Sequence, residues 1–227
     1  MTPRRGGQEP IFHMRYDTVI FDLDGTLLDT IEDLAASVNF VMDEFGFPNR
    51  SVDEVRSFVG NGILNLVALC IPGGRDNPQL MQAFELYKKH YAEHCLEKTV
   101  PYPGIPELVA GLKAEGRSLA VVSNKFDIGT QALMEKNFPG VFDFVMGETP
   151  GVERKPAPDS VRLAMAALGA RDETTVYVGD SEVDIKTAAN SGLACISVTW
   201  GFRPREELER LNPYRLADTP EQLRDML

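Results

Sequence analysis

Two carboxylates stand one residue apart, directly after an apolar run near the beginning of the sequence. Residues 19–21 are typical of a buried strand, and Asp22, Asp24 and Gly25 follow at once. Charges at the end of a buried strand need partners or a chemical task, because burying an unpaired charge is costly. The pattern therefore predicts that Asp22 and Asp24 lie side by side at the carboxyl end of a central strand, where open parallel sheets bind ligands.

Further polar groups follow predicted strands or stand just past them later in the chain. They are Ser123 with Asn124, Lys155, and Asp180 with Asp184. Because the carboxyl ends of parallel strands share one edge of a sheet, we expect these side chains to converge on the first two carboxylates.

This set of side chains indicates phosphoryl-transfer chemistry. Three or four carboxylates in one crevice repel one another unless a cation lies between them. Oxygen ligands without histidine or cysteine favour a hard ion, and a few protein ligands beside a phosphate favour Mg²⁺. The hydroxyl of Ser123 and the ammonium group of Lys155 suit a phosphoryl group. Together the residues predict phosphoryl transfer to a carboxylate nucleophile.

The elements that must position these residues alternate between strands and helices after residue 104. Strands are predicted at 118–122, 142–146, 175–178 and 194–198, and helices at 105–115, 127–136, 159–168 and 184–190. Two further helices are predicted to begin at Pro204 and Pro220. The alternation predicts an α/β fold with a Rossmann-like parallel sheet and helices on both faces.

Residues 29–98 carry helical periodicity and no strand pattern. Helices are predicted at 31–45, 63–70 and 78–95, and Ser51 with Glu54 forms a capping-box pattern at the beginning of another. The sequence thus predicts an α/β core of residues 15–28 and 99–227, an inserted all-helical domain of residues 29–98, and a disordered extension of residues 1–14.

The composition is that of an acidic globular protein. The chain has 227 residues, 43% of them hydrophobic, and a formal net charge of −11. A diffuse acidic surface disfavours nucleic acid and anionic membranes, and no apolar run approaches the ~18 residues of a membrane span. Cys70, Cys95 and Cys195 form no metal-binding or disulfide pattern. We therefore expect a cytoplasmic protein with reduced thiols and with neither a nucleic-acid nor a membrane partner.

The motifs taken together resemble the haloacid dehalogenase-like hydrolase superfamily over residues 16–227. They are, in order, Asp22-Leu23-Asp24-Gly25-Thr26, Val122-Ser123-Asn124-Lys125, Arg154-Lys155-Pro156-Ala157-Pro158-Asp159, and Val178-Gly179-Asp180-Ser181 with Asp184. The helical domain resembles that superfamily's small cap. Residues 59–62, 123–125 and 200–202 look most like those of phosphoglycolate phosphatases.

The resemblance implies a phosphatase that works through an aspartyl phosphate. Asp22 would attack phosphorus, and Asp24 would protonate the leaving oxygen and then activate water. Ser123 would hydrogen-bond a phosphoryl oxygen, and Lys155 would neutralise the charge of the nucleophile and the phosphate.

The resemblance also implies that Mg²⁺ is the cofactor. Asp22, the backbone carbonyl of Asp24, and Asp180 would bind the ion. Asp184 would not be a direct ligand but would orient Lys155 or a metal-bound water.

The implied substrate is a small phosphorylated metabolite, with 2-phosphoglycolate the first candidate. Gly60 and Asn61 precede a predicted helix, whose first amide groups could hold a carboxylate. Arg56, Asn124 and Lys125 are further candidates for substrate binding.

Other functions stay open at this point, and the sequence does not reveal the oligomeric state. A pyrophosphatase, a sugar-phosphate phosphatase and a phosphomutase of the same superfamily would share these motifs, whereas Asp24 argues against a dehalogenase. From other classes, His90, Glu93 and His94 match the His-x-x-Glu-His order of a zinc hydrolase. A non-catalytic binding module could also use this fold, although the complete set of candidate catalytic residues argues against it.

Overall fold

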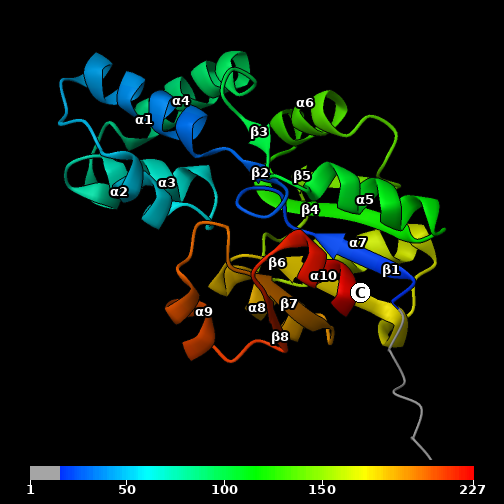
Figure 1. Cartoon of the computed structure of the whole chain (residues 1–227). Coiled ribbons are helices and arrows are strands. Elements are labelled where there is room, and N and C mark those ends of the chain that lie inside the picture. The colour runs from blue at the N-terminus through cyan, green and yellow to red at the C-terminus, as the bar shows by residue number, and fades with distance from the viewer. Residues whose placement is uncertain (1–15) are drawn as a thin grey trace, which may run out of the picture.

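A computed structural model describes residues 16–227 as a six-stranded sheet flanked by helices, with a second, two-stranded sheet (Figure 1). The strands are β1 (Thr18–Phe21), β2 (Leu28–Asp29), β3 (Val100–Pro101), β4 (Ser118–Phe126), β5 (Phe144–Glu148), β6 (Thr175–Gly179), β7 (Ala194–Val198) and β8 (Arg215–Ala217). The order in the larger sheet is β5-β4-β1-β6-β7-β8, and every neighbouring pair is parallel. The predicted α/β fold with a parallel sheet is confirmed. The predicted extension of residues 1–14 lies outside the described residues.

The helices fall at the positions that apolar periodicity predicts, with small shifts at their ends. They are α1 (Ile31–Phe45), α2 (Val52–Phe58), α3 (Ile63–Cys70), α4 (Leu80–His94), α5 (Ile105–Ala114), α6 (Asp127–Asn137), α7 (Asp159–Leu168), α8 (Glu182–Asn190), α9 (Arg205–Arg210) and α10 (Pro220–Met226), with short 3₁₀ turns η1 (Gly74–Asp76) and η2 (Asp172–Thr174). The capping box of Ser51 and Glu54 is formed at α2. Within residues 16–227, no helix is long and apolar enough to cross a membrane.

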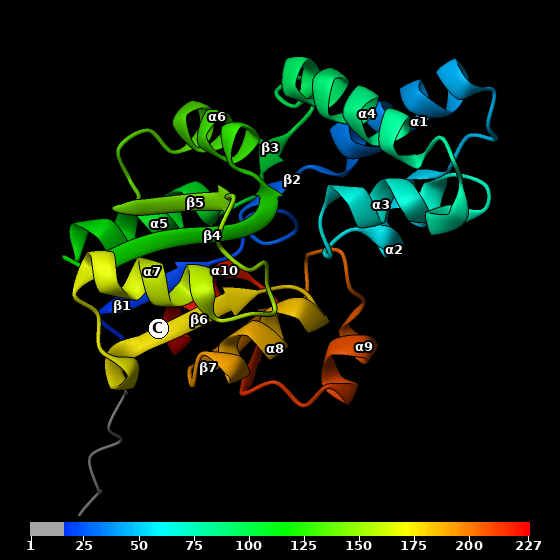
Figure 2. The same ribbon diagram turned by 180° about the vertical axis from the view of Figure 1, so that it is seen from behind.

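Separate hydrophobic clusters cover the two faces of the larger sheet. On one face the strands pack against α5, α6 and α10, and on the other against α7 and α8 (Figures 1 and 2). Val19 and Phe21 belong to the first cluster and Ile20 to the second, as the alternation of side chains along a strand requires. Because β1 lies inside the sheet and is buried on both faces, its carboxyl end brings Asp22 to the middle of the sheet edge.

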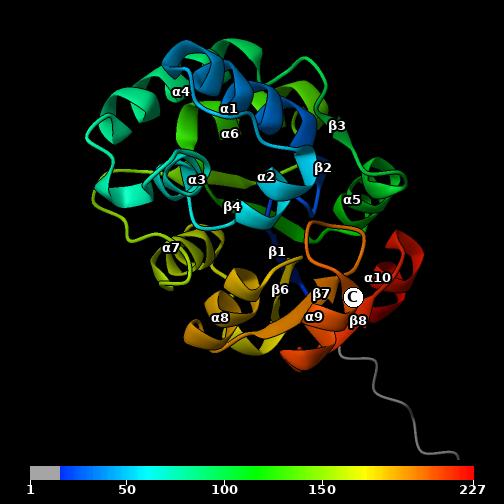
Figure 3. The same ribbon diagram turned by 90° about the vertical axis from the view of Figure 1, so that its left-hand side faces the viewer.

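Helices α1–α4 lie between β2 and β3 in the sequence and share a hydrophobic cluster of their own. We call this segment, residues 30–99, the helical insertion, and Figure 3 shows its helices gathered on one side of the sheet core. The two strands at its ends were not predicted from the sequence. Leu28 pairs with Pro101 and Asp29 with Val100, in an antiparallel arrangement too short to leave a periodic pattern. The division of the chain into domains at residues 28/29 and 98/99 stays a prediction.

The carboxylate of Asp33 ties the end of the helical insertion to its beginning. Asp33 is buried in α1 and accepts hydrogen bonds from the backbone N–H groups of Lys98 and Thr99, at 3.0 and 2.9 Å, and from the Thr99 hydroxyl at 2.8 Å. A buried carboxylate with this many donors holds its partners firmly. The two ends of the insertion are therefore fixed to each other as well as to β2 and β3.

The strand predicted to end at Val122 is longer than expected. β4 continues through Ser123, Asn124 and Lys125, with an irregular register against β5 between Val122 and Phe126. Polar side chains within a strand broke the apolar pattern on which the prediction relied.

Lys155 stands past the end of β5, and a loop separates it from Glu148. Strand β8 was not predicted, because its sequence Arg215-Leu216-Ala217 has no recognisable alternation.

Candidate active site

One cavity between the sheet edge and the helical insertion collects most of the predicted site residues. It contains about 570 Å³ of empty space, including its open mouth. The predicted residues that line it are Asp22, Asp24, Gly60, Ser123, Asn124, Lys125, Lys155 and Asp180. Side chains from the helical insertion, including Leu34, Ile63 and Leu66, supply an apolar wall opposite these polar groups. A concave site of this kind, with a few convergent polar groups, is typical of a ligand-binding site.

Lys155 is the centre of a buried network of charges. Its Nζ atom lies 2.7 Å from Asp22 Oδ1 and 2.9 Å from Asp184 Oδ1, and it donates to the Tyr177 hydroxyl at 3.0 Å. The second oxygen of Asp184 accepts hydrogen bonds from the backbone N–H and the hydroxyl of Ser181, at 3.1 and 2.6 Å. Asp184 does not line the cavity, but through these contacts it holds Lys155 beside Asp22.

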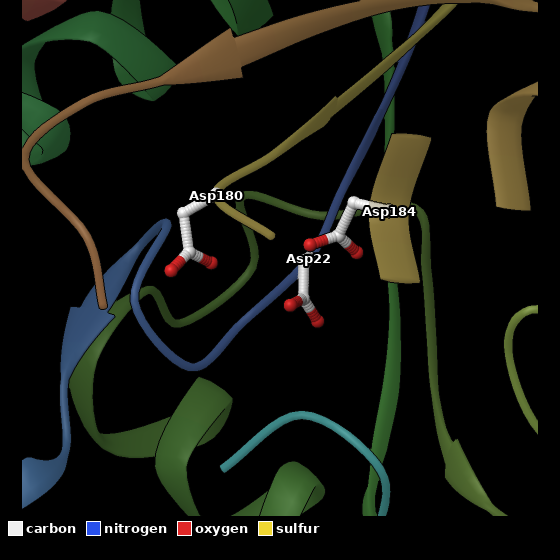
Figure 4. Close-up of side chains that lie close together, drawn as sticks. All are labelled: Asp22, Asp180 and Asp184. Carbon is white, nitrogen blue, oxygen red and sulfur yellow. The ribbon is translucent and has the colours of Figure 1, made fainter. Parts of the chain in front are cut away.

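The carboxylates of Asp22, Asp180 and Asp184 converge from three different elements. They come from the ends of β1 and β6 and from the first turn of α8, and each offers an oxygen atom within 4.8 Å of the other two (Figure 4). All three residues are buried. Oxygen donors this close together form a site that a hard divalent cation could occupy.

Burial and mutual repulsion shift the acid–base behaviour of this cluster. Burial raises the pKa of Asp22 to about 7, and the charge of Asp184 adds to the rise, while Lys155 opposes it. Burial followed by the charges of Asp184 and Asp22 raises the pKa of Asp180 well above its ordinary range. Burial lowers the pKa of Lys155, but the two neighbouring carboxylates outweigh it, so the net shift is upward. A bound cation would relieve the repulsion, and the residues present therefore fit a metal ion.

The two histidines of the helical insertion contact neighbouring side chains. His90 Nδ1 lies 3.0 Å from Ser37 Oγ, and its ring stacks on His94 with ring centres 4.3 Å apart. His94 Nδ1 lies 2.6 Å from Glu97 Oε1. In the part of the chain that the structure describes, the aspartate cluster is the one group of at least three suitable side chains that could hold a metal ion. The zinc-hydrolase alternative built on His90, Glu93 and His94 therefore gains no support from the described part of the chain.

Asp24 faces the cavity beside an unexpected partner. The Nζ atom of Lys125 lies 2.8 Å from Asp24 Oδ1, and the Thr30 hydroxyl donates to the same oxygen at 2.7 Å. Lys125 also lies over the ring of Tyr91 in α4, 4.6 Å from its centre. The sequence predicts a substrate-binding role for Lys125 but gives no sign of its pairing with Asp24.

Ser123 and Asn124 lie on β4 at the floor of the cavity. The Ser123 hydroxyl accepts a hydrogen bond from the backbone N–H of Lys125 at 3.1 Å. The Asn124 side chain accepts from the backbone N–H of Lys155 at 2.9 Å and donates to its carbonyl at 3.0 Å. It also donates to the carbonyl of Gly60 at 3.0 Å, and it therefore joins the Lys155 loop to the helical insertion.

Two predicted residues lie away from this cavity, and one charged residue that lines it was missed. Asn61 is exposed and lines a neighbouring cavity beside Arg154, whereas Arg56 pairs with Asp53 at 2.5 Å on the surface of α2. Their substrate-binding roles stay predictions. Arg203 lines the main cavity and was not identified from the sequence, although it directly follows the noted stretch 200–202.

The sequence of this chain is similar to those of known proteins. The sequence profile described as haloacid dehalogenase-like hydrolase matches residues 19–198. The phosphoglycolate phosphatase of Pseudomonas putida is 32% identical over 206 residues, which cover 88% of this chain and 75% of that protein. The phosphoglycolate phosphatase of Neisseria meningitidis is 35% identical over 189 residues, covering 81% of this chain and 80% of that protein.

A solved structure shows the same arrangement of elements. It is a Lactobacillus delbrueckii subsp. bulgaricus protein with a provisional assignment as a phosphoglycolate phosphatase. That chain is 38% identical and superposes with a TM-score of 0.89 over 93% of this chain and 98% of its own length.

Proposed function

The chain belongs to the haloacid dehalogenase-like hydrolase family and is a phosphatase, and from this premise we propose that it hydrolyses 2-phosphoglycolate with Mg²⁺ as its metal. The observation that carries the proposal is the convergence of Asp22, Asp24, Ser123 and Lys155 on one cavity. A nucleophile, an acid–base group, a hydroxyl and an ammonium group are the parts that phosphate-ester hydrolysis through a covalent intermediate requires.

In the first step Asp22 attacks phosphorus and the bond from phosphorus to the leaving oxygen breaks. The product is an aspartyl phosphate on Asp22, and the leaving oxygen takes a proton from Asp24. Lys155, 2.7 Å from Asp22 Oδ1, balances the negative charge of nucleophile and phosphate. Ser123 donates its hydroxyl proton to a phosphoryl oxygen and limits the orientations of the group.

In the second step Asp24, now ionised, removes a proton from the attacking water. The water oxygen bonds to phosphorus, the bond from phosphorus to the Asp22 oxygen breaks, and inorganic phosphate leaves. The Nζ atom of Lys125 lies 2.8 Å from Asp24 Oδ1, and this contact keeps the Asp24 side chain in the cavity for both steps. Asp24 thus returns to its initial protonation state at the end of each cycle.

Asp22 and Asp180, with the backbone carbonyl of Asp24, would hold Mg²⁺, and Asp184 would keep Lys155 in place. When bound, the ion supplies positive charge that offsets the charge building up on the phosphoryl oxygens. Oxygen-only donors and the absence of histidine or cysteine from the cluster favour Mg²⁺ over softer metals.

The carboxylate of 2-phosphoglycolate would bind on the side of the helical insertion, which we propose acts as a cap. Gly60 and Gly62 line the cavity, and Gly62 is the N-cap of α3, so the first amides of this helix open toward it. Lys125 supplies a positive charge in the same cavity. Asn61 and Arg56 would contact the substrate only if the helical insertion moved closer to the sheet core.

The decisive experiment measures phosphate release from 2-phosphoglycolate, pyrophosphate, sugar phosphates and nucleotides, with Mg²⁺ and with a chelator, beside an Asp22→Asn variant. Magnesium-dependent preference for 2-phosphoglycolate, lost in the variant, supports the proposal. A preference for sugar phosphates or pyrophosphate is consistent with the proposed mechanism but contradicts 2-phosphoglycolate as the substrate.

The role of Asn61 has a test of its own. The Asn61→Ala variant should raise KM for 2-phosphoglycolate more than KM for p-nitrophenyl phosphate if the side chain contacts the carboxylate. An equal effect on both substrates contradicts that role.

We also propose a cytoplasmic location, which the free cysteines Cys70, Cys95 and Cys195 support.

A further inference from the structure

The segment Phe202-Arg203, in the loop between β7 and α9 of the sheet core, reaches into the helical insertion. The Phe202 side chain belongs to the hydrophobic cluster of the insertion, not to either cluster of the sheet. Its backbone N–H donates to Asp180 Oδ2 at 2.7 Å. Phe202 therefore packs against the insertion and also binds Asp180, one of the three aspartates of the acidic cluster formed with Asp22 and Asp184.

Arg203 binds backbone carbonyls of the insertion beside this contact. Its guanidinium donates to the carbonyl of Val59 at 2.7 Å and to that of Arg56 at 3.2 Å. Both carbonyls lie at the end of α2, where the last carbonyls of a helix lack partners within it. Hydrogen bonds from a charged donor to such groups are stronger than neutral ones.

The Arg203 side chain is fixed from the core side. Its Nε atom donates to Glu182 Oε2 at 2.8 Å, and the side chain is 8% exposed. Glu182 begins α8, two residues after Asp180. The Nη2 atom also lies 3.4 Å from Glu182 Oε1, so the core holds the guanidinium in one orientation while Nη1 and Nη2 donate to the insertion.

The loop carrying Arg203 also packs directly on the acidic cluster. A Cβ atom added to Gly201 would come within 2.4 Å of both Asp180 Cβ and the carbonyl oxygen of Gly25. The backbone at Gly201 therefore has no room to shift toward Asp180. On the other side of the cavity, Asn124 joins the carbonyl of Gly60 to the backbone of Lys155.

We infer that Arg203 is a positioning residue which, with Phe202, holds the helical insertion closed over the cavity and links that closure to Asp180. If the insertion moved away from the core, Arg203 would lose two carbonyl partners and the Phe202 ring would become exposed to water. The same movement would release the loop that binds Asp180. Closure of the insertion over the cavity therefore depends on contacts within the chain itself. Only the kinetic part of the test rests on the proposed function.

The test combines a distance measurement with kinetics on three variants, Arg203→Ala, Arg203→Lys and Arg205→Ala. Spin labels would be placed by Leu69→Cys in α3 and Leu163→Cys in α7, both exposed, while the native cysteines are buried. Arg205 is the matched control, since it lies on the surface of α9 and pairs with Glu209 at 2.7 Å.

We expect Arg203→Ala to lengthen and broaden the distances between the labels. We also expect it to lower kcat/KM for p-nitrophenyl phosphate by about tenfold or more. Arg203→Lys should give distances and a kcat/KM between those of the parent protein and those of Arg203→Ala. One ammonium group cannot bind Glu182 and two carbonyls in the arginine geometry. Arg205→Ala should match the parent protein in both measurements.

The inference is overturned if Arg203→Ala keeps the parent distance distribution and kcat/KM, even if its melting temperature falls. It is also overturned if Arg205→Ala gives the same changes as Arg203→Ala. If 2-phosphoglycolate is not a substrate, the distances, which need no substrate, still decide whether Arg203 holds the insertion closed.

Discussion

The Nζ atom of Lys125 lies 2.8 Å from Asp24 Oδ1, inside the cavity that also contains Asp22 and Lys155. Lys125 is 5% exposed, and its partner is the residue proposed to donate and accept the proton during catalysis. The same ammonium group lies over Tyr91 of the helical insertion. One cation therefore contacts the acid–base group and the element proposed to close over the substrate.

Lys125→Met should impair binding of a substrate that carries a carboxylate in addition to its phosphate group. We expect KM for 2-phosphoglycolate to rise about tenfold, and KM for p-nitrophenyl phosphate to rise less, because only the former presents a carboxylate. Steady-state kinetics with both substrates measure the difference. Lys113→Met, on the surface of α5 in an ion pair with Asp143, is the control. Equal increases for both substrates would argue that Lys125 acts through Asp24 alone.

Lys155→Met should destabilise the metal-free protein near neutral pH. Removing the ammonium group leaves Asp22 and Asp184 buried without their cation, and breaking a buried ion pair costs about 3 kcal/mol. Urea unfolding in the presence of a chelator measures the change. Lys186→Met, exposed on α8, should leave stability unchanged. A Lys155→Met protein as stable as the parent at neutral pH would show that water already screens the cluster.

The stability of the metal-free protein should fall as pH rises. The pKa of Asp22 is raised from its ordinary value of 3.8 to about 7, mainly by burial, so the folded state holds this proton more tightly than the unfolded state. The resulting stabilisation is fully present below pH 3.8 and is lost as pH rises through about 7. Melting temperatures between these values, measured with a chelator, should show the decline.

The Asp22→Asn variant and Mg²⁺ should each reduce this loss of stability. The amide cannot ionise, so the metal-free variant should be more stable than the parent by about 1–3 kcal/mol at pH values above 7. Mg²⁺ binds the ionised cluster of the folded state and should raise the melting temperature of the parent more than that of the variant. Identical pH profiles for parent and variant would rule out Asp22 as the source of the decline.

Asp33→Ala should loosen the end of the helical insertion. The carboxylate accepts hydrogen bonds from the backbone N–H groups of Lys98 and Thr99, and leaving the buried Thr99 donor without a partner costs about 2 kcal/mol. Hydrogen exchange should be faster at both amides. Asp43→Ala, exposed on the same helix, should not change it. Unchanged protection in Asp33→Ala would mean that β2 and β3 alone fix this end.

The sequence predicted the parallel sheet and the gathering of site residues because both leave local patterns. Asp22 and Asp24 stand two residues apart after an apolar strand, so a short stretch suffices to identify them. Arg203 leaves no such pattern, since its partners are backbone carbonyls of residues 144 and 147 positions away. Any amino acid at those positions would present the same carbonyl group.

The pairing of Lys125 with Asp24 and the strands β2 and β3 were missed for different reasons. Lys125 and Asp24 are 101 residues apart, and only the folded sheet brings their side chains together. A two-residue strand spans a single period of alternation, so no repeat is present to reveal it. A contact between distant residues accounts for the first omission, and the short length of the strands accounts for the second.

The antiparallel pair formed by β2 and β3 has a consequence for how this protein can diverge in evolution. The chain leaves the core at Leu28 and returns at Pro101, and these two residues are direct partners. A segment whose ends meet can lengthen, shorten or be replaced without altering the register of the strands that carry the nucleophile. The substrate selectivity that we propose for the insertion could therefore change while the residues at the sheet edge stay in place.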